Sequence, residues 1–185
     1  MTVKELLCET MRLVGRTEEA DAVERGSANE AATRLKHALL TYLNAVLDEL
    51  ARGYFPLDTQ ESMSSENGEY AFSQFLKAPL KINRVTDGEK AIEWHICPNY
   101  LKTDCKNITV YYEYLPPALD EEDEFFYPVF AVGARLAEYG VAAEYFLVCG
   151  DGTAYALWEG RYRAEIENLL ARSTVKGRIP PRRWI

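Results

Sequence analysis

Apolar residues recur at helical spacing in two stretches near the start of the chain, at positions 3–14 and 31–50. The second series steps by threes and fours along one face: Ala31, Leu35, Ala38, Leu39, Tyr42, Leu43, Val46 and Leu50. Thr2 with Glu5, and Ser27 with Glu30, have the spacing of capping boxes and are expected to begin these helices. Residues 17–25 are expected to add only a short helical turn between them.

Helical spacing is lost between positions 54 and 115, where short segments alternate between apolar and polar residues. In the last segment one face carries Ile108, Val110, Tyr112 and Tyr114. Asp87-Gly88 separates two apolar segments and is a favoured tight turn of a β-hairpin. The pattern predicts four to six antiparallel strands with one face buried.

Helical character returns after Pro116-Pro117. The acidic run 120–124 is expected to begin a long helix, because acids suit the positive end of the helix dipole, with Pro128 in the first turn. The following apolar stretch is expected to be surrounded by neighbours on most sides. Thr153 is expected to cap a last helix, which ends near Arg172.

These elements predict an α+β fold in which an antiparallel β module is inserted between helices two and three of a four-helix bundle. The bundle comprises residues 1–53 with 119–172, and the inserted β domain comprises residues 54–118. Residues 173–185 form an extended, basic C-terminal arm, since Gly177, Pro180 and Pro181 oppose a helix there.

Composition narrows the class of protein. The chain has 185 residues, 48% of them apolar and 12% aromatic, which supports a packed core and excludes a disordered tail, a collagen or a small disulfide scaffold. No apolar run reaches the roughly 18–20 residues that cross a bilayer, and we expect no signal peptide. The four cysteines show no CxxC spacing and are expected to be reduced: Cys8, Cys97, Cys105 and Cys149.

Charge is unevenly distributed along the chain. The net charge is −8, yet the last ten residues carry +4 and the remainder therefore −12. An acidic body disfavours tight wrapping of DNA, because phosphate contact depends on Lys and Arg. It remains compatible with a surface past which DNA slides without adhering.

Catalytic and metal-binding signals are weak. His37 is interpreted as a partly exposed helix residue. His95 lies near Cys97 and Cys105, but a structural zinc site needs four ligands at paired spacings. The acidic run 120–124 lacks the pattern of a calcium loop. We therefore expect no enzyme, no metal and no cofactor.

The order of segments resembles a known family. It includes Val110-Tyr111-Tyr112, "LPP" at 115–117, the acidic run, "EYGVAAEYFL" at 138–147, and a final helix with Trp158 and Tyr162 before "IPPRRW". This arrangement resembles the head–tail connector proteins of tailed bacteriophages, also called portal adaptors, tail tubular or head-completion proteins. The resemblance spans the element order, with residue-level support over 108–185, and fits the larger adaptors that carry a β domain.

The resemblance implies a non-enzymatic virion protein at the head–tail junction, assembled in the bacterial host cytoplasm. It implies a ring, usually twelve-fold, that docks beneath the portal protein, binds tail or stopper proteins below, and lets DNA pass as cargo. The arm of such proteins typically extends to the portal. The docking residues expected here are Lys176, Arg178, Ile179, Pro180, Pro181, Arg182, Arg183 and Trp184.

Two further hypotheses concern this arm and the acidic body. The arm is expected to reach an acidic partner surface, either on the next subunit or on the portal, because Arg and Trp are favoured at interface hot spots. An acidic lumen would repel the DNA backbone.

Two other classes remain open. One is a small-molecule-binding or enzymatic α+β protein with a site between bundle and sheet, where His95 or Glu93 would be the first suspects. The other is a DNA-binding regulator that uses the basic arm.

Overall fold

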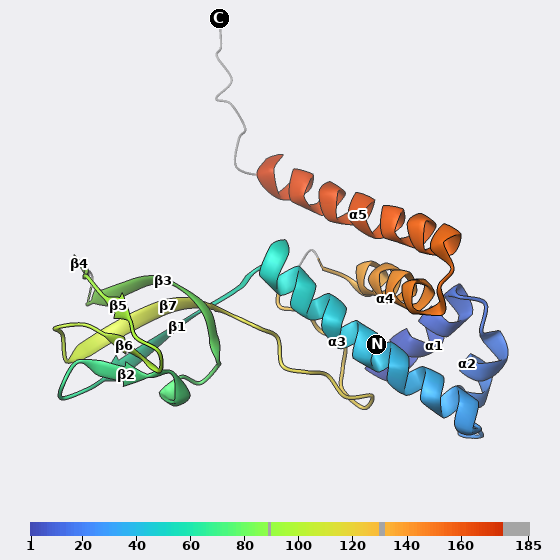
Figure 1. The fold of residues 1–185 in the computed structure, drawn as a ribbon, viewed down its shortest axis with the longest axis horizontal. Coiled ribbons are helices and arrows are strands. Elements are labelled where there is room, and N and C mark those ends of the chain that lie inside the picture. Colours follow the sequence, from blue (N-terminus) through green and yellow to red (C-terminus); the bar gives the residue numbers. More distant parts are fainter. Residues whose placement is uncertain (89, 130–131, 176–185) are drawn as a thin grey trace, which may run out of the picture. The chain divides into compact units, whose positions relative to one another are not determined.

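The computed structural model describes residues 1–88, 90–129 and 132–175. The chain divides into two compact units (Figure 1). The helical unit comprises Met1–Glu49 and the described residues from Ala118 onward, and the β unit comprises Leu50–Pro117. The two units are described separately below.

The helical unit contains five helices within the described residues: α1 (Val3–Leu13), α2 (Thr17–Glu24), α3 (Glu30–Gly53), α4 (Ala134–Cys149) and α5 (Gly152–Val175). The last four residues of α3 belong to the β unit. None of the five is long and apolar enough to cross a membrane.

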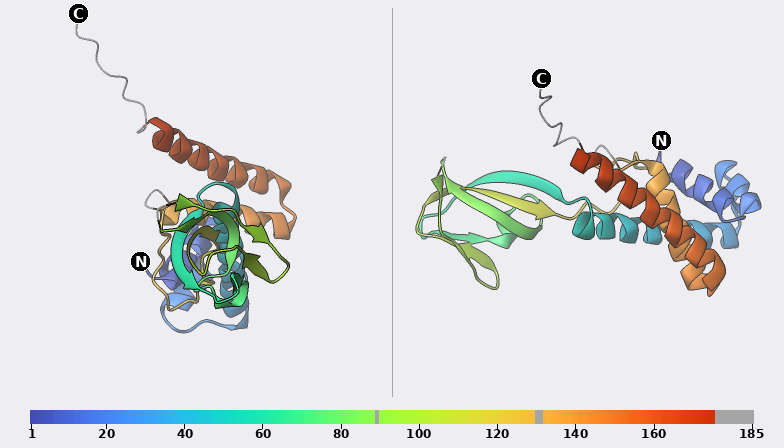
Figure 2. Two further views of the ribbon diagram at one scale, coloured as in Figure 1. Left: turned by 90° about the vertical axis from the view of Figure 1, so that its left-hand side faces the viewer. Right: turned by 90° about the horizontal axis from the view of Figure 1, so that it is seen from above.

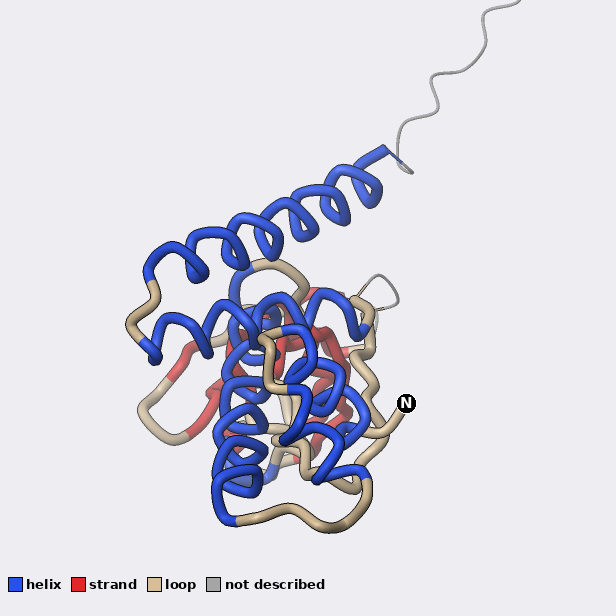
Figure 3. Tube along the Cα trace, turned by 90° about the vertical axis from the view of Figure 1, so that its right-hand side faces the viewer, coloured by secondary structure: helices blue, strands red, loops and turns tan. Residues whose placement is uncertain are grey.

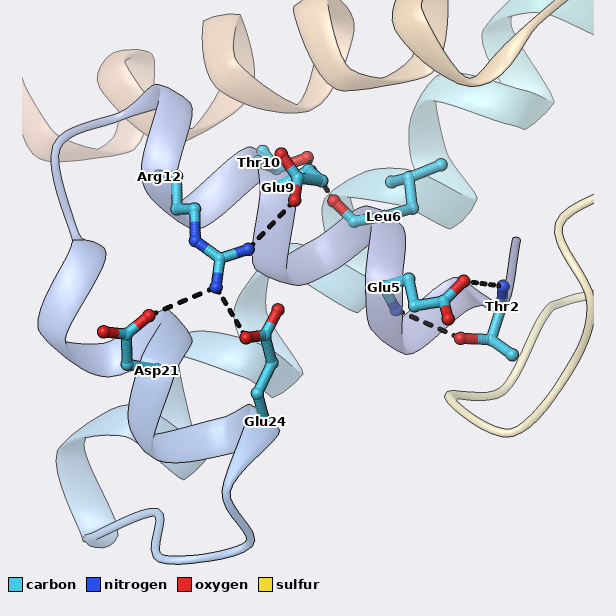
Figure 4. Close-up of polar contacts among 8 residues, drawn as sticks. All are labelled: Thr2, Glu5, Leu6, Glu9, Thr10, Arg12, Asp21 and Glu24. Carbon is cyan, nitrogen blue, oxygen red and sulfur yellow. Dashed lines mark hydrogen bonds and ion pairs between the residues drawn. The ribbon is translucent and has the colours of Figure 1, made fainter.

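Local sequence sets the start of α1. The Glu5 amide donates to Thr2 Oγ1 at 3.2 Å, and the Thr2 amide donates to Glu5 Oε2 at 2.9 Å (Figure 4). These reciprocal bonds form the predicted capping box and satisfy amides that have no partner within the helix. Val3, Leu6, Leu7 and Met11 are fully buried on the predicted face.

The start of α3 differs from the prediction. The Ala32 amide donates to Asn29 Oδ1 at 2.8 Å, so Asn29 caps the helix. Ser27 instead donates to the Ala22 carbonyl at the end of α2. The predicted capping box at Ser27 and Glu30 is wrong because Glu30 is the first residue of the helix, whereas a capping box needs its glutamate in the third position.

The acidic run does not begin a helix. Residues 120–124 lie in a loop, and α4 begins only at Ala134, so Pro128 is not in its first turn. The Asp123 carbonyl accepts from the Val3 amide at 2.8 Å, and the Glu121 carbonyl accepts from the Lys4 amide at 3.1 Å. The loop therefore satisfies the exposed amides at the start of α1, a long-range role that spacing along the sequence does not reveal.

The prediction of a four-helix bundle is wrong. Residues 17–25, expected to form a short turn, contain helix α2, which packs against α1. The strands consequently follow the third helix, and the five helices are not arranged as a four-helix bundle with a β module between helices two and three. The broader expectation of helices with antiparallel strands is confirmed.

Helices α3, α4 and α5 meet at Gly140. A Cβ atom on this glycine would lie 2.7 Å from Val46 Cγ1 on α3 and 3.0 Å from Tyr162 Cε2 on α5. Glycine therefore permits the close approach of all three helices. Figure 3 shows α5 lying across α4 in this unit, and the C-terminal end of α5 extends beyond the other helices.

The β unit contains seven strands in two antiparallel sheets within the described residues. They are β1 (Leu57–Ser64), β2 (Glu69–Ala71), β3 (Pro79–Asp87), β4 (Lys90–Ala91), β5 (His95–Ile96), β6 (Tyr100–Lys102) and β7 (Asn107–Tyr114). The larger sheet has the order β1-β7-β3-β4 and the smaller one β2-β6-β5. A short 3₁₀ turn, Phe72–Gln74, follows β2.

The predicted core face of β7 is confirmed, since Ile108, Val110, Tyr112 and Tyr114 are all buried. Phe75 packs edge-on against Tyr112, with ring centroids 5.2 Å apart. A hairpin between β3 and β4 is confirmed, but Asp87 pairs with Lys90 and is therefore the last residue of β3, so the predicted Asp87-Gly88 turn is shifted. Gly88 has a φ of +65°, in the left-handed region that glycine adopts readily.

Candidate functional site

The docking residues expected in the C-terminal arm lie outside the described residues. They are Lys176, Arg178, Ile179, Pro180, Pro181, Arg182, Arg183 and Trp184. Their role stays a prediction. The candidate site is therefore sought on the described surface.

Charge is concentrated in the helical unit. Residues 1–49 and 118–175 contain 10 basic and 20 acidic residues, whereas residues 50–117 contain 7 basic and 9 acidic residues. The excess of negative charge that the composition indicates thus belongs almost entirely to the helical unit, which includes the acidic loop at 120–124.

Aromatic side chains gather where α4 and α5 pack together. Trp158 on α5 is 8% exposed and belongs to a small core with Val14, Ala142 and Ala143. Four half-buried rings pack against this core, and with Trp158 they form what we call the aromatic face: Tyr139, Tyr145, Phe146, Tyr155 and Trp158. The Tyr139 and Trp158 ring centroids are 5.8 Å apart.

Two arginines border the aromatic face. The Arg161 guanidinium lies 4.6 Å from the centroid of the Trp158 ring. Arg135 Nε donates to the Tyr139 hydroxyl at 2.7 Å, and its guanidinium lies 5.5 Å from that ring. Cation–π contacts of this kind contribute about 0.5–1 kcal/mol at exposed sites. Tryptophan, tyrosine and arginine are also the residue types enriched at interface hot spots.

Exposed aliphatic side chains adjoin the aromatic face in sequence. Leu147 and Val148, in the last turn of α4, are 51% and 66% exposed. Leu157, beside Trp158 on α5, is 53% exposed. Three exposed aliphatic side chains therefore stand next in sequence to residues of the aromatic face. Exposed apolar side chains mark a surface that binds another protein where they form a contiguous patch.

The junction between α1 and α2 lies next to Val14, which belongs to the core beneath the aromatic face. Arg12 donates to Glu9 at 2.9 Å, to Asp21 at 3.2 Å and to Glu24 at 2.6 Å (Figure 4). The bond to Arg12 lowers the pKa of the Glu24 carboxyl. Because the three acids come from both helices, Arg12 ties α2 to the end of α1, where Val14 joins the core beneath the aromatic face.

The residues considered for chemistry do not converge. His37 on α3 and His95 on β5 are exposed, as is Glu93. Among the described residues, no three histidine, cysteine or acidic side chains are grouped so that they could hold a metal ion. Cys8 is buried, and burial raises the pKa of its thiol.

The β unit has an open apolar hollow of about 340 Å³. It is lined by Phe72, Ala78, Pro79, Leu80, Lys81, Ile82 and Ile96. Among the described residues that line it, Lys81 is the only ionisable one, and its amine lies 3.2 Å from Glu113 Oε1. The hollow therefore offers shape and apolar contact without the paired acids, bases or nucleophiles of an enzyme site.

Comparison with known proteins adds no assignment: no protein-family model matches this sequence, and no curated protein matches it.

Proposed function

We propose that this chain is a structural adaptor at the head–tail junction of a tailed bacteriophage. It would assemble into a ring, twelve-fold by resemblance to head–tail connectors, that joins the portal to tail or stopper proteins and lets DNA pass. The resemblance over residues 108–185 supports the phage assignment. The observation that carries an assembly role is the aromatic face, with exposed aliphatic residues beside it.

Apolar burial contributes more free energy to assembly than charge repulsion between the chains opposes. Burying Leu147, Val148 and Leu157, which are half to two-thirds exposed, would contribute on the order of 2–4 kcal/mol per interface. Chains of charge −8 repel one another, but at physiological salt that repulsion is screened beyond roughly 8 Å. Apolar contact at short range can therefore outweigh it.

The charge of the helical unit supports the passage of DNA without adhesion. Affinity for the DNA backbone depends on contacts from lysine and arginine to the phosphates. Because this unit carries twice as many acidic as basic residues, we expect it to bind DNA weakly. The basic arm has the opposite charge, which supports its proposed role of docking on an acidic partner surface.

The test is co-assembly with the portal protein encoded in the same genome, followed by light scattering and electron microscopy. Leu157→Glu should reduce incorporation into portal complexes at least tenfold, since it places a charge beside the aromatic face. Thr41→Glu is the matched control, because it adds the same charge at an exposed position of α3. Absence of complexes with the unaltered chain, or equal incorporation of both variants, would contradict the proposal.

A further inference from the structure

Strand β1 forms one margin of the four-stranded sheet, and within the described part of the chain it pairs with β7 alone. Figure 2 shows it (teal) running along the outside of the β unit. Its register with β7 is unbroken over eight residues, from Leu57 opposite Tyr114 to Ser64 opposite Asn107. The side chains alternate, with Asp58, Gln60 and Ser62 exposed on the outer face.

The bonding pattern identifies which backbone groups of β1 face away from β7. The Ser65 amide donates to the Lys106 carbonyl at 2.8 Å, so this pair is hydrogen-bonded. Bonded pairs alternate along an antiparallel ladder, and the odd-numbered residues of β1 are therefore the ones that bond to β7. The amides and carbonyls of Asp58, Gln60, Ser62 and Ser64 point outward, and no described residue pairs with them.

The opposite margin of the sheet is protected against pairing. β3 begins with Pro79, which has no amide hydrogen, and its register with β7 shifts at two places, around Leu80 and Asn83. Lys81 is exposed on it, and β4 covers Thr86 and Asp87. Proline, bulges, lysine and a covering strand are the usual means of blocking an edge. β1 contains no proline, lysine or bulge, and no strand among the described residues covers its outer edge.

One feature of β1 could disfavour pairing. The Glu61 side chain points toward the inner face of the sheet, and an inward-pointing charge is another means of protecting an edge strand. Its carboxylate is already used inside the β unit. Glu61 Oε2 accepts from the Tyr112 hydroxyl at 3.0 Å and from the Leu76 amide at 3.1 Å. The carboxylate is thus hydrogen-bonded within the β unit and does not occupy the outward-facing backbone groups of β1.

We propose that β1 pairs with β1 of a second copy of this chain, antiparallel across a two-fold axis, with Gln60 opposite Gln60. The even-numbered residues of β1, whose amides and carbonyls point outward, must lie opposite even-numbered residues of the second copy. The two strands can therefore shift relative to each other only in steps of two residues. In this register Asp58 faces Ser62, and Leu57 faces Met63. A shift that brings Ser64 opposite Asp58 sets Glu61 against Glu61, and like charges directly opposite are destabilising. In the proposed register Pro56 lies opposite Ser64, at the very end of the pairing. A shift the other way shortens the pairing and moves Pro56 opposite Ser62.

This two-fold contact is distinct from the proposed ring. It joins a surface to itself and closes after two copies, whereas a ring needs head-to-tail contacts. It also depends on the β unit alone, whereas the proposed adaptor role was argued from α4 and α5. The two can fail independently.

A pair of lysine variants of the full chain tests the register, with the dimer dissociation constant measured by analytical ultracentrifugation. Gln60→Lys sets two lysines opposite each other and should weaken the dimer at least tenfold. Ser62→Lys adds the same charge on the same face but sets each lysine opposite Asp58, so the dimer should be as tight or tighter. A monomeric unaltered chain at all concentrations, or equal weakening by both variants, would overturn the proposal.

Cross-linking provides a second measurement, in a Cys149→Ser background that removes the exposed cysteine. Hydrogen-bonded pairs have Cα atoms about 5.5 Å apart, within the range that a disulfide can span. Gln60→Cys should therefore form a covalent dimer on mild oxidation. Ser62→Cys should not, because its two copies would lie roughly 14 Å apart along the strands. Equal cross-linking of both variants would contradict the register.

Discussion

At the scale of single residues, Gly140 shows how one missing side chain sets helix packing. An added Cβ would lie within 3.0 Å of side chains from two neighbouring helices, Val46 and Tyr162. Gly140→Ala should lower the free energy of unfolding by about 1–3 kcal/mol, because overpacking outweighs the better helix propensity of alanine. Urea denaturation followed by circular dichroism measures this change.

Gly160 provides the matched control, since it lies in the interior of α5 with no atom near its missing side chain. Gly160→Ala should raise the free energy of unfolding by roughly 0.5–1 kcal/mol, through helix propensity alone. The same substitution is thus expected to have opposite signs at the two sites. Stabilisation at both would show that the contact at Gly140 relaxes without cost.

Two glutamates are expected to affect stability in opposite directions with pH. Burial raises the pKa of Glu138, and the nearby Glu9 carboxylate adds to this rise. Its ionisation therefore costs stability as pH increases from the unfolded pKa through the folded pKa. Glu138→Gln should raise the midpoint of thermal unfolding at pH 7, and the difference should vanish at acidic pH, where the wild-type carboxyl is protonated.

Glu24 behaves in the opposite sense. The hydrogen bond from Arg12 lowers its pKa, so the stability it contributes is present above the unfolded pKa and is lost as pH falls through the folded pKa. Glu24→Gln should lower the unfolding midpoint at pH 7 and converge with wild type in acid. Thermal melts of both variants from pH 3 to 7 measure the pair, and shifts of equal sign would refute this account.

At the scale of elements, the start of α3 offers a direct test of helix capping. Asn29→Ala removes the acceptor of the Ala32 amide and should lower the free energy of unfolding by about 1 kcal/mol. Ser27→Ala, the control, should change it by no more than a few tenths, because Ser27 does not cap α3. A larger loss from the serine variant would reinstate the capping box expected from the sequence.

Elements encoded by neighbouring residues could be predicted, whereas those decided by distant contacts could not. The capping box at Thr2 and the buried face of β7 depend on spacing within a few residues, and both are present. The loop at 120–124 carries a helix-like charge pattern, yet its backbone bonds to the start of α1 more than a hundred residues earlier. Periodicity holds no information on such a contact.

The aromatic face was only partly visible in the sequence. Of its residues, the sequence pattern places Trp158 in the last helix, where it is buried. The exposure of Leu147 and Val148 differs from the prediction, because the apolar stretch before Gly150 indicates neighbours on most sides. Which apolar residues stay uncovered depends on how α5 crosses α4, and a single helix cannot specify this.

At the scale of the whole molecule, charge separates the chain into parts with different potential partners. The described helical unit has a net charge of −10, the β unit −2 and the last ten residues +4. The basic arm and an acidic surface on a neighbouring copy or on the portal would thus attract each other electrostatically. The charges of two helical units repel, so a contact between them depends on apolar burial. Selective contact between unlike parts favours ordered assembly over aggregation.

Removal of residues 176–185 tests the docking role proposed for the basic arm. The truncated chain should keep its helical circular dichroism signal, because every described helix ends before residue 176, and it should lose attachment to the portal. Replacing Arg178, Arg182 and Arg183 by glutamine should weaken attachment and reduce its dependence on salt, since the lost attraction is electrostatic. Trp184→Ala should weaken attachment without changing its dependence on salt. Pull-down at several salt concentrations separates the electrostatic contribution of the arginines from the apolar contribution of Trp184. A truncated chain that still joins portal to tail would exclude a docking role for this segment.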